Sequence, residues 1–174
     1  MFSLKQSQKG GLWMLVGVIS DTHDNIDRIN QAIEVFNERA VELVIHAGDI
    51  TSPFALIPFN EKLRADYVGI FGNNDGDKVL LHKRSEGRIK PQPHIFELNG
   101  KRTVVVHEHF LVESLALSGE YDIVIYGHTH RARVERKGNT LILNPGEAGH
   151  WLYGKATVAI LDTEKMDAEI ITLP

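Results

Sequence analysis

The sequence contains no cysteine. This absence excludes a disulfide framework, a thiolate zinc finger, an iron–sulfur cluster and a cysteine nucleophile. Any metal ion that this chain binds must therefore be held by nitrogen and oxygen ligands. Histidine, by contrast, is plentiful, with nine among the 174 residues.

An excess of positive charge is also missing, because 19 basic and 23 acidic side chains give a formal net charge of -4. A chain without a global positive field does not hold a long polyanion by counterion release. We therefore expect a small substrate and no stable complex with a nucleic-acid polymer. No apolar run approaches the ~18 residues needed to cross a bilayer, so we expect a soluble, cytoplasmic protein without a membrane partner.

The chain begins with a polar, aperiodic segment that ends in glycines. This composition predicts a flexible N-terminal extension over residues 1–12. Residues 13–174 contain no repeat and no Ser- or Pro-rich linker, and their number suits one domain. We expect a single domain and, because homo-oligomers are common, a small assembly such as a dimer or tetramer.

Apolar periodicity predicts an α/β fold. Continuous apolar runs indicate strands covered on both faces, and their alternation with helices up to residue 71 implies parallel pairing. Asn99-Gly100 and Gly138-Asn139 predict two later hairpins. We expect mixed sheets packed face to face and flanked by helices. The predicted strands are residues 14–20, 42–46, 67–71, 95–98, 102–106, 123–126, 134–136, 141–143, 157–161 and 168–172, and the predicted helices are residues 25–39, a short helix from Pro53, 77–86 and 111–117.

Five polar clusters each follow a predicted strand. In α/β sheets, ligands bind in the crevice outside the carboxyl ends of the strands, so these clusters are expected to converge on one site. They are Asp21-Thr22-His23, Gly48-Asp49, Gly72-Asn73-Asn74-Asp75, His107-Glu108-His109 and Gly127-His128-Thr129-His130.

Seven side chains in these clusters are candidate metal ligands. In an extended segment, residues i and i+2 point to the same side, so Asp21 should point with His23 and His128 with His130. Carboxylate, imidazole and amide donors suit manganese, iron, zinc, nickel or cobalt better than calcium or magnesium. One tetrahedral ion cannot use all seven, whereas two ions that share a carboxylate can. The seven are Asp21, His23, Asp49, Asn73, His107, His128 and His130.

Each cluster also has an ordinary structural explanation when taken alone. Asp21 and His23 precede a predicted helix and resemble a helix start. Gly48-Asp49 and the glycine-asparagine segment are typical turns. Gly127-His128-Thr129-His130, directly after an apolar strand, is harder to explain in this way. The joint occurrence of all five clusters favours a metal site.

The remaining histidines are expected outside the ligand set. His46 lies within a predicted strand and is expected to be buried and hydrogen-bonded beside the site. His82 and His94 have charged or proline-rich neighbours and are expected at the surface. His150 and Trp151 either line the pocket or pack in an exposed loop.

In this order, Asp-x-His, Gly-Asp, Gly-Asn-x-Asp, His-x-His and Gly-His-Thr-His resemble the motifs of the calcineurin-like metallophosphoesterases, in particular the small prokaryotic YfcE-type phosphodiesterases. The resemblance covers residues 14–172, and Asn144-Pro145-Gly146 is similar to that family's closing loop. It implies a four-layer α/β/β/α sandwich of two mixed sheets flanked by helices. It also implies hydrolysis of small phosphoesters by in-line attack of a hydroxide that bridges a binuclear metal centre.

The resemblance assigns the candidate ligands to two divalent ions that share Asp49. We expect Mn2+ first, with Ni2+, Fe2+, Zn2+ or Co2+ as alternatives. Asp75 is expected to orient His107 or His23 from outside the ligand set. The implied sets are Asp21, His23, Asp49 and His130 for one ion, and Asp49, Asn73, His107 and His128 for the other.

Two positions depart from the family's pattern. Asn74 stands where many members carry a histidine that protonates the leaving group or grips the phosphate, and Glu108 stands where glycine is usual. An amide cannot act as a general acid, so phosphodiesters are expected to be better substrates than phosphomonoesters. Asn74 and His109 are the candidate catalytic residues, expected to contact the phosphoryl oxygens.

The alternative function is a non-catalytic metal-binding scaffold. It would resemble the retromer subunit of this family, whose metal pocket is degraded. The presence of every expected ligand in this chain counts against the scaffold.

Overall fold

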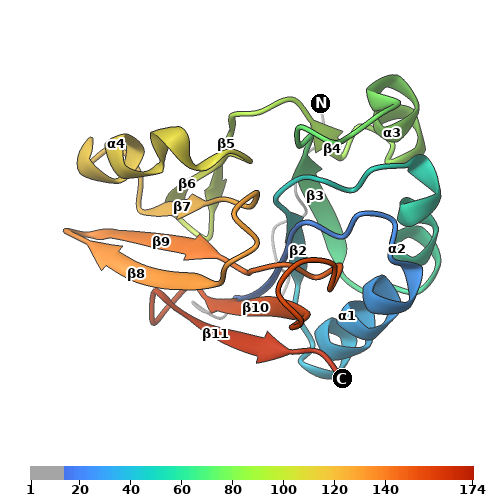
Figure 1. Ribbon diagram of the computed structural model, residues 1–174. Helices are drawn as coiled ribbons and strands as arrows, with labels where there is room; N and C mark the ends of the chain where they lie inside the picture. The colour runs from blue at the N-terminus through green and yellow to red at the C-terminus, as the bar shows by residue number, and fades with distance from the viewer. Residues whose placement is uncertain (1–13) are drawn as a thin grey trace.

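The structure, a computed structural model, describes residues 14–174. Its strands form two sheets that lie against each other (Figure 1). The predicted extension over residues 1–12 lies outside the described residues. The first sheet has the order β11-β10-β1-β2-β3-β4, and the second has the order β5-β6-β7-β9-β8. The strands of the first are β1 (Leu15–Ile19), β2 (Leu43–His46), β3 (Asp66–Ile70), β4 (Ile89–Lys90), β10 (Thr157–Asp162) and β11 (Asp167–Thr172). Those of the second are β5 (His94–Leu98), β6 (Lys101–Val105), β7 (Ile123–Ile125), β8 (Arg133–Lys137) and β9 (Thr140–Asn144).

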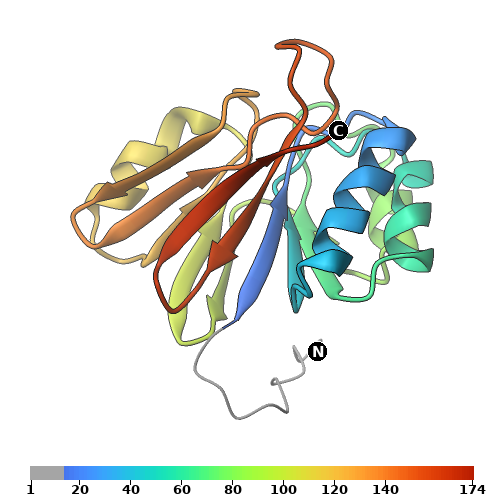
Figure 2. The same cartoon turned by 90° about the horizontal axis from the view of Figure 1, so that it is seen from below.

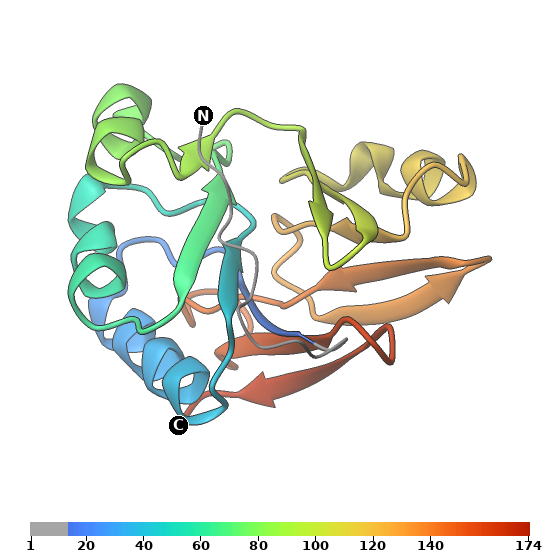
Figure 3. The same ribbon diagram turned by 180° about the vertical axis from the view of Figure 1, so that it is seen from behind.

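Helices cover the outer face of each sheet (Figures 1 and 3). The longest of these helices, α1 (Ile26–Glu38), begins where the sequence predicts. The Asn25 side chain accepts a hydrogen bond from Arg28 N and so satisfies a free backbone amide in the first turn of the helix. Among the described residues, no helix is long and apolar enough to cross a membrane. The first sheet carries α1 (Ile26–Glu38), η1 (Pro53–Leu56), α2 (Ile57–Glu61) and α3 (Lys78–Arg84), and the second carries η2 (His109–Leu111) and α4 (Val112–Leu117).

Three apolar cores separate the layers, whose order can be followed in Figure 2. Phe36 of α1 belongs to the core on the outer face of the first sheet, together with Val44. The neighbouring residue Ile45 belongs to the core between the sheets, which also contains Val105. Val104 belongs to the third core, under α4. Neighbouring strand residues thus face opposite sides, as the pleat requires, and the order of layers confirms the predicted α/β/β/α sandwich.

Parallel strands set the position of the site. β1, β2 and β3 run parallel, with Ile19 opposite His46 and His46 opposite Gly69. β6, β7 and β9 run parallel in the second sheet. Because parallel neighbours end at the same edge of their sheet, the loops after these six strands are brought close together. β10 pairs with β1 in the antiparallel direction.

Both predicted hairpins are confirmed. β5 and β6 turn at Asn99 and Gly100, whose φ angles of 49° and 74° suit a tight hairpin turn. β8 and β9 pair around Gly138. The short strand β4 is absent from the prediction, because two residues carry no periodicity.

Candidate metal centre

Loops after six parallel strands meet at one edge of the sandwich. From the first sheet, β1 leads to the Asp-Thr-His motif, β2 to Asp49 and β3 to residues 72–75. From the second, β6 leads to His107, β7 to the Gly-His-Thr-His motif and β9 to Glu147. The structure brings all seven predicted ligands together in this place.

Asp21, His23 and His130 form a first ligand group. Asp21 Oδ1 lies 4.0 Å from His23 Nε2 and 3.4 Å from His130 Nε2. His23 Nε2 also lies 3.6 Å from Asp49 Oδ2. This nitrogen is buried and has no hydrogen-bond partner within residues 14–174. A buried polar nitrogen without a partner, close to two carboxylates, is what a cation would satisfy.

Asn73, His107 and His128 form a second group beside Asp49. Asn73 Oδ1 lies 2.9 Å from both His107 Nε2 and His128 Nδ1. His107 Nε2 lies 3.2 Å from Asp49 Oδ2. His107 Nδ1 lies 2.8 Å from the carbonyl oxygen of Ala47. Since a carbonyl can only accept, Nδ1 donates to Ala47, and in the neutral imidazole Nε2 is the nitrogen that would bind an ion.

Asp49 lies between the two groups. Its Oδ2 reaches His23 Nε2 on one side and His107 Nε2 on the other. Asp21 is also near both groups, because ligand atoms of Asp21, Asp49 and His107 lie within 4.8 Å of one another. This arrangement is compatible with the bridging position that the family resemblance implies for Asp49.

The donor set fits two divalent ions. It combines two fully buried carboxylates, four imidazoles and one amide oxygen, all within the described residues. Buried carboxylates need compensating positive charge. Imidazole-rich sites of this composition suit manganese, iron, zinc, nickel or cobalt.

The candidate ligands converge through left-handed backbone turns, so the predicted extended i, i+2 geometry is wrong. Asp21 and His23 have φ angles of 54° and 42°, and His128 and His130 have 65° and 56°. Each such residue costs about 1–3 kcal/mol, which contacts such as His23 N donating to Asp49 O at 3.1 Å help to offset. The side chains therefore point into one site because the backbone turns at these residues, and not because side chains alternate along an extended strand.

Two motif glycines allow this close approach. A Cβ at Gly72 would overlap the carboxylate and backbone nitrogen of Asp49, and a Cβ at Gly127 would overlap Ser20 Oγ. Any larger residue would therefore displace the candidate ligands.

The two buried aspartates have different electrostatic environments. Burial raises the pKa of Asp21 above its ordinary value. Burial acts in the same direction on Asp49, but the hydrogen bond and charge of His107, with two hydrogen bonds from Asn74, outweigh it and hold the pKa of Asp49 well below its usual range. For His107, burial lowers the pKa, yet Asp49 outweighs burial and raises the pKa. Asp49 is therefore an anion at neutral pH, the form that binds a cation.

The predicted catalytic residues border this centre. Asn74 donates from its backbone N to Asp49 Oδ1 and from its Nδ2 to Asp49 Oδ2, each at 2.8 Å. Its side chain thus contacts the carboxylate between the two groups. His109 is exposed, and its ring stacks on His128 with centroids 5.7 Å apart. Contact of Asn74 or His109 with phosphoryl oxygens stays a prediction.

Asp75, which is predicted to orient His107 or His23, accepts hydrogen bonds from backbone amides. Its Oδ1 accepts a hydrogen bond from Thr51 N at 2.6 Å, and its Oδ2 accepts one from Gly72 N at 2.7 Å. The buried carboxylate therefore ties the loop after β2 to the loop after β3 through hydrogen bonds from backbone amides.

Glu147 is a site residue that sequence reasoning misses. It is fully buried, and its Oε2 lies 3.3 Å from His130 Nδ1. The carboxylate also accepts hydrogen bonds from the backbone nitrogens of Trp151 and Leu152. The contact between Oε2 and His130 Nδ1 does not have hydrogen-bond geometry, because His130 Nδ1 has no hydrogen-bond partner within residues 14–174. A carboxylate at this distance from the far nitrogen would orient the ring if His130 held a metal ion. Its position in the sequence could have indicated this role, because Glu147 follows β9 just as each of the five predicted clusters follows its strand.

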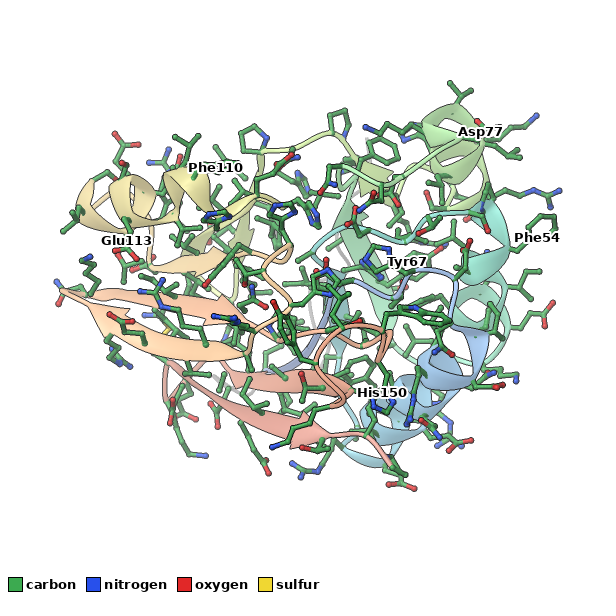
Figure 4. The ribbon with its side chains drawn as sticks, in the orientation of Figure 1. Phe54, Tyr67, Asp77, Phe110, Glu113 and His150 are labelled. Carbon is green, nitrogen blue, oxygen red and sulfur yellow. The ribbon has the colours of Figure 1, made fainter. Side chains whose placement is uncertain are left out.

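The other histidines lie mostly as predicted. His46 is 1% exposed, with Nε2 3.2 Å from Thr22 Oγ1, which confirms that it is buried and hydrogen-bonded. His82 is exposed, but His94 is half-buried, because its ring packs against Phe96 of the same strand. His150 lies with Trp151 in an exposed loop between β9 and β10 (Figure 4).

The chain belongs to the calcineurin-like phosphoesterase superfamily. Residues 14–166 match the Calcineurin-like phosphoesterase superfamily domain. The protein is therefore an enzyme of the metallophosphoesterase class, a hydrolase.

Named relatives and solved structures agree with this class. The chain is 40% identical over 166 residues to Phosphodiesterase MJ0936 of Methanocaldococcus jannaschii. The aligned region covers 92% of this chain and 99% of that protein. It is 26% identical over 142 residues to Phosphodiesterase YfcE of Escherichia coli, covering 73% and 75%. A solved archaeal phosphodiesterase matches with a TM-score of 0.87 at 40% identity, covering 92% and 100%. Vps29 of Chaetomium thermophilum matches with a TM-score of 0.69 at 14% identity, covering 94% and 98%, and shares the fold alone.

Proposed function

We propose that this protein is a metal-dependent phosphodiesterase that hydrolyses small phosphodiesters in preference to phosphomonoesters. The observation that carries the proposal is the place of Asp49, whose Oδ2 lies 3.6 Å from His23 Nε2 and 3.2 Å from His107 Nε2. A carboxylate between two donor groups suits two divalent ions, of which Mn2+ is our first choice. Two such ions would lower the pKa of bound water toward ~7, neutralise the phosphoryl oxygens and so favour in-line attack on phosphorus.

The chain's own residues determine which leaving groups are favoured. Asn74 can donate a hydrogen bond but cannot protonate a departing oxygen. His109, exposed beside His128, is our candidate donor to the phosphoryl oxygens. With no acid at position 74, esters whose leaving group needs little protonation react best. Activated diesters are such esters, so we expect them to be hydrolysed without an acid at position 74.

The test uses chelated protein to which single divalent ions are returned. We expect Mn2+ to restore hydrolysis of bis(4-nitrophenyl) phosphate, with slower hydrolysis of 4-nitrophenyl phosphate. Asp49→Asn should reduce kcat by about 10²-fold or more. Asp162→Asn is the matched control, because this aspartate is also hydrogen-bonded but lies at the end of β10 and pairs with Lys165. Undiminished turnover in Asp49→Asn, or faster hydrolysis of the monoester, would refute the proposal.

A metal-binding scaffold is the second candidate function. The observation that favours it is that the Asn74 amide is hydrogen-bonded to Asp49 and cannot act as an acid. The full set of candidate ligands counts against it. Turnover separates the two functions: protein shown to bind two ions, yet inactive on both esters with manganese, nickel, iron, zinc and cobalt, would be a scaffold.

Assembly and location are further proposals that rest on composition. We propose a dimer or tetramer, which light scattering measures directly. We also propose a cytoplasmic location, which fractionation of the source cells tests.

A further inference from the structure

A row of aromatic rings leads from the candidate metal centre to the surface. His128 meets His107 edge-on, with ring centroids 5.2 Å apart. His109 stacks on His128 with an interplanar angle of 15°. Phe110 lies against His109 with centroids 4.4 Å apart, and 6.5 Å from the ring of His128. The row therefore connects two candidate metal ligands to an outer phenyl ring.

Phe110 ends this row with most of its side chain open to solvent. It is 74% exposed, and the neighbouring Leu111 is 61% exposed. Val112, the next residue, is buried in the core under α4 and fixes this segment on the second sheet. Figure 4 shows Phe110 beside α4. Its position is therefore held by the fold, while its ring remains available to a ligand.

Exposure alone does not distinguish Phe110, because single exposed apolar residues are common on protein surfaces. Trp151 and Tyr153 are also exposed, but among the described residues neither forms a ring pair with a candidate ligand. The distinguishing feature of Phe110 is its distance from His128. Stacked aromatic groups have centroids about 4.5–7 Å apart, so a ring attached to a phosphoryl group near His128 is within reach of Phe110.

We propose that Phe110 is a specificity-determining residue that stacks against a flat aromatic ring in an ester substituent of the substrate. The substrate class is a phosphoester of an aryl alcohol or of a nucleoside, whose shared chemistry is the planar ring. This inference rests on the proposed function and narrows its substrate. Aromatic stacking tolerates different rings, because every base and aryl group has a π-face.

Binding measurements test this proposal without relying on turnover. Protein loaded with Mn2+ is titrated calorimetrically with methyl phosphate, phenyl phosphate and uridine 5′-monophosphate. We expect phenyl phosphate to bind more tightly than methyl phosphate, and Phe110→Ala to reduce this affinity ratio by about tenfold. Phe110→Trp should preserve the ratio. The matched control is Phe54→Ala, because Phe54 is 73% exposed but lies at the outer edge of the other half of the molecule (Figure 4).

The outcomes separate this proposal from the proposed function. An unchanged ratio in Phe110→Ala overturns the stacking role. A changed oligomeric state with an unchanged ratio assigns Phe110 to an interface between copies and also overturns it. Failure of wild-type protein to take up Mn2+ before these titrations refutes the metal centre itself, and with it both proposals. Equal binding, or no binding, of methyl and phenyl phosphate by the Mn2+-loaded wild-type protein overturns the stacking role alone. A parallel loss for uridine 5′-monophosphate extends the class to nucleosides, whereas a loss for phenyl phosphate alone limits it to aryl esters.

Discussion

His46 provides a quantitative test of how this fold controls a buried imidazole. Gly48 N donates a hydrogen bond to His46 Nδ1 at 3.2 Å, so Nε2 carries the proton and donates it to Thr22 Oγ1. Protonation of Nδ1 would place two donors against each other in a site that is 1% exposed. Burial, with the charge of His107, lowers the pKa of His46 from 6.5 to about 3.

The sign of the effect on stability follows from this lowered pKa. Below pH 6.5 the unfolded chain binds a proton at His46, whereas the folded protein binds it only near pH 3. The free energy of unfolding therefore falls as the pH decreases through this range, by up to about 1.4 kcal/mol per pH unit. Between pH 7 and pH 5 the loss from this one group is about 2 kcal/mol. Whole domains are stable by only about 5–15 kcal/mol, so the effect is measurable.

Urea unfolding of wild-type protein and His46→Asn, both in chelator, measures this loss. Asparagine retains an acceptor for Gly48 N but does not titrate, so the variant should be less stable at pH 7 and less sensitive to acid. We expect wild-type protein to lose about 2 kcal/mol more than the variant between pH 7 and pH 5. Parallel stability curves would show that the folded protein accepts a proton at His46, which would refute the reasoning.

Four further predictions follow from the site. Glu147→Gln should weaken Mn2+ binding about 10–100-fold in calorimetry, because the far nitrogen of His130 loses a carboxylate; unchanged affinity would mean that other contacts orient this ring. Mn2+ returned to chelated protein should raise the melting temperature, by ~2.7 kcal/mol of added stability at a hundredfold excess over Kd, and an unmoved melting curve would count against the cluster. Asn74→His should speed hydrolysis of esters with poor leaving groups by about 10²–10⁴-fold; equal dependence of kcat/KM on leaving-group pKa in both proteins would place residue 74 away from the leaving group. Protein that begins at Met14 should keep its activity, because every candidate ligand follows this residue, and a folded but inactive product would assign a role to the extension.

The positions of the strands along the chain and the convergence of the candidate ligands could be predicted because both leave local signals. Apolar runs mark the buried strands, and polar clusters at their ends mark the loops that meet at the site. The prediction that Asp21 and His23 share a direction through extended backbone was wrong, since both adopt left-handed conformations. Such conformations are disfavoured for these residues and depend on hydrogen bonds from neighbouring loops, which residue spacing does not reveal.

Contacts between loops explain what could not be predicted. Glu147 reaches His130, Asn74 reaches Asp49, and Asp75 reaches the backbone of Thr51. Each pair joins loops after neighbouring strands of one sheet, so the partner depends on which strands pair and on how their loops fold. For Asp75 the hydrogen bonds that the structure shows come from backbone amides, and its role beside the ligands stays a prediction.

β10 follows all six site loops in the chain, yet it pairs with β1, which precedes them. Ribosomes add about 5–20 residues per second, so β1 leaves the ribosome roughly 7–30 seconds before its neighbour β10. Throughout this interval one edge of β1 lacks its partner. Early in it, Asp21 and Asp49 have been made but the imidazoles of the second sheet have not. The nascent chain therefore lacks part of the candidate ligand set during this time, and the site can form only after the second sheet has been synthesised.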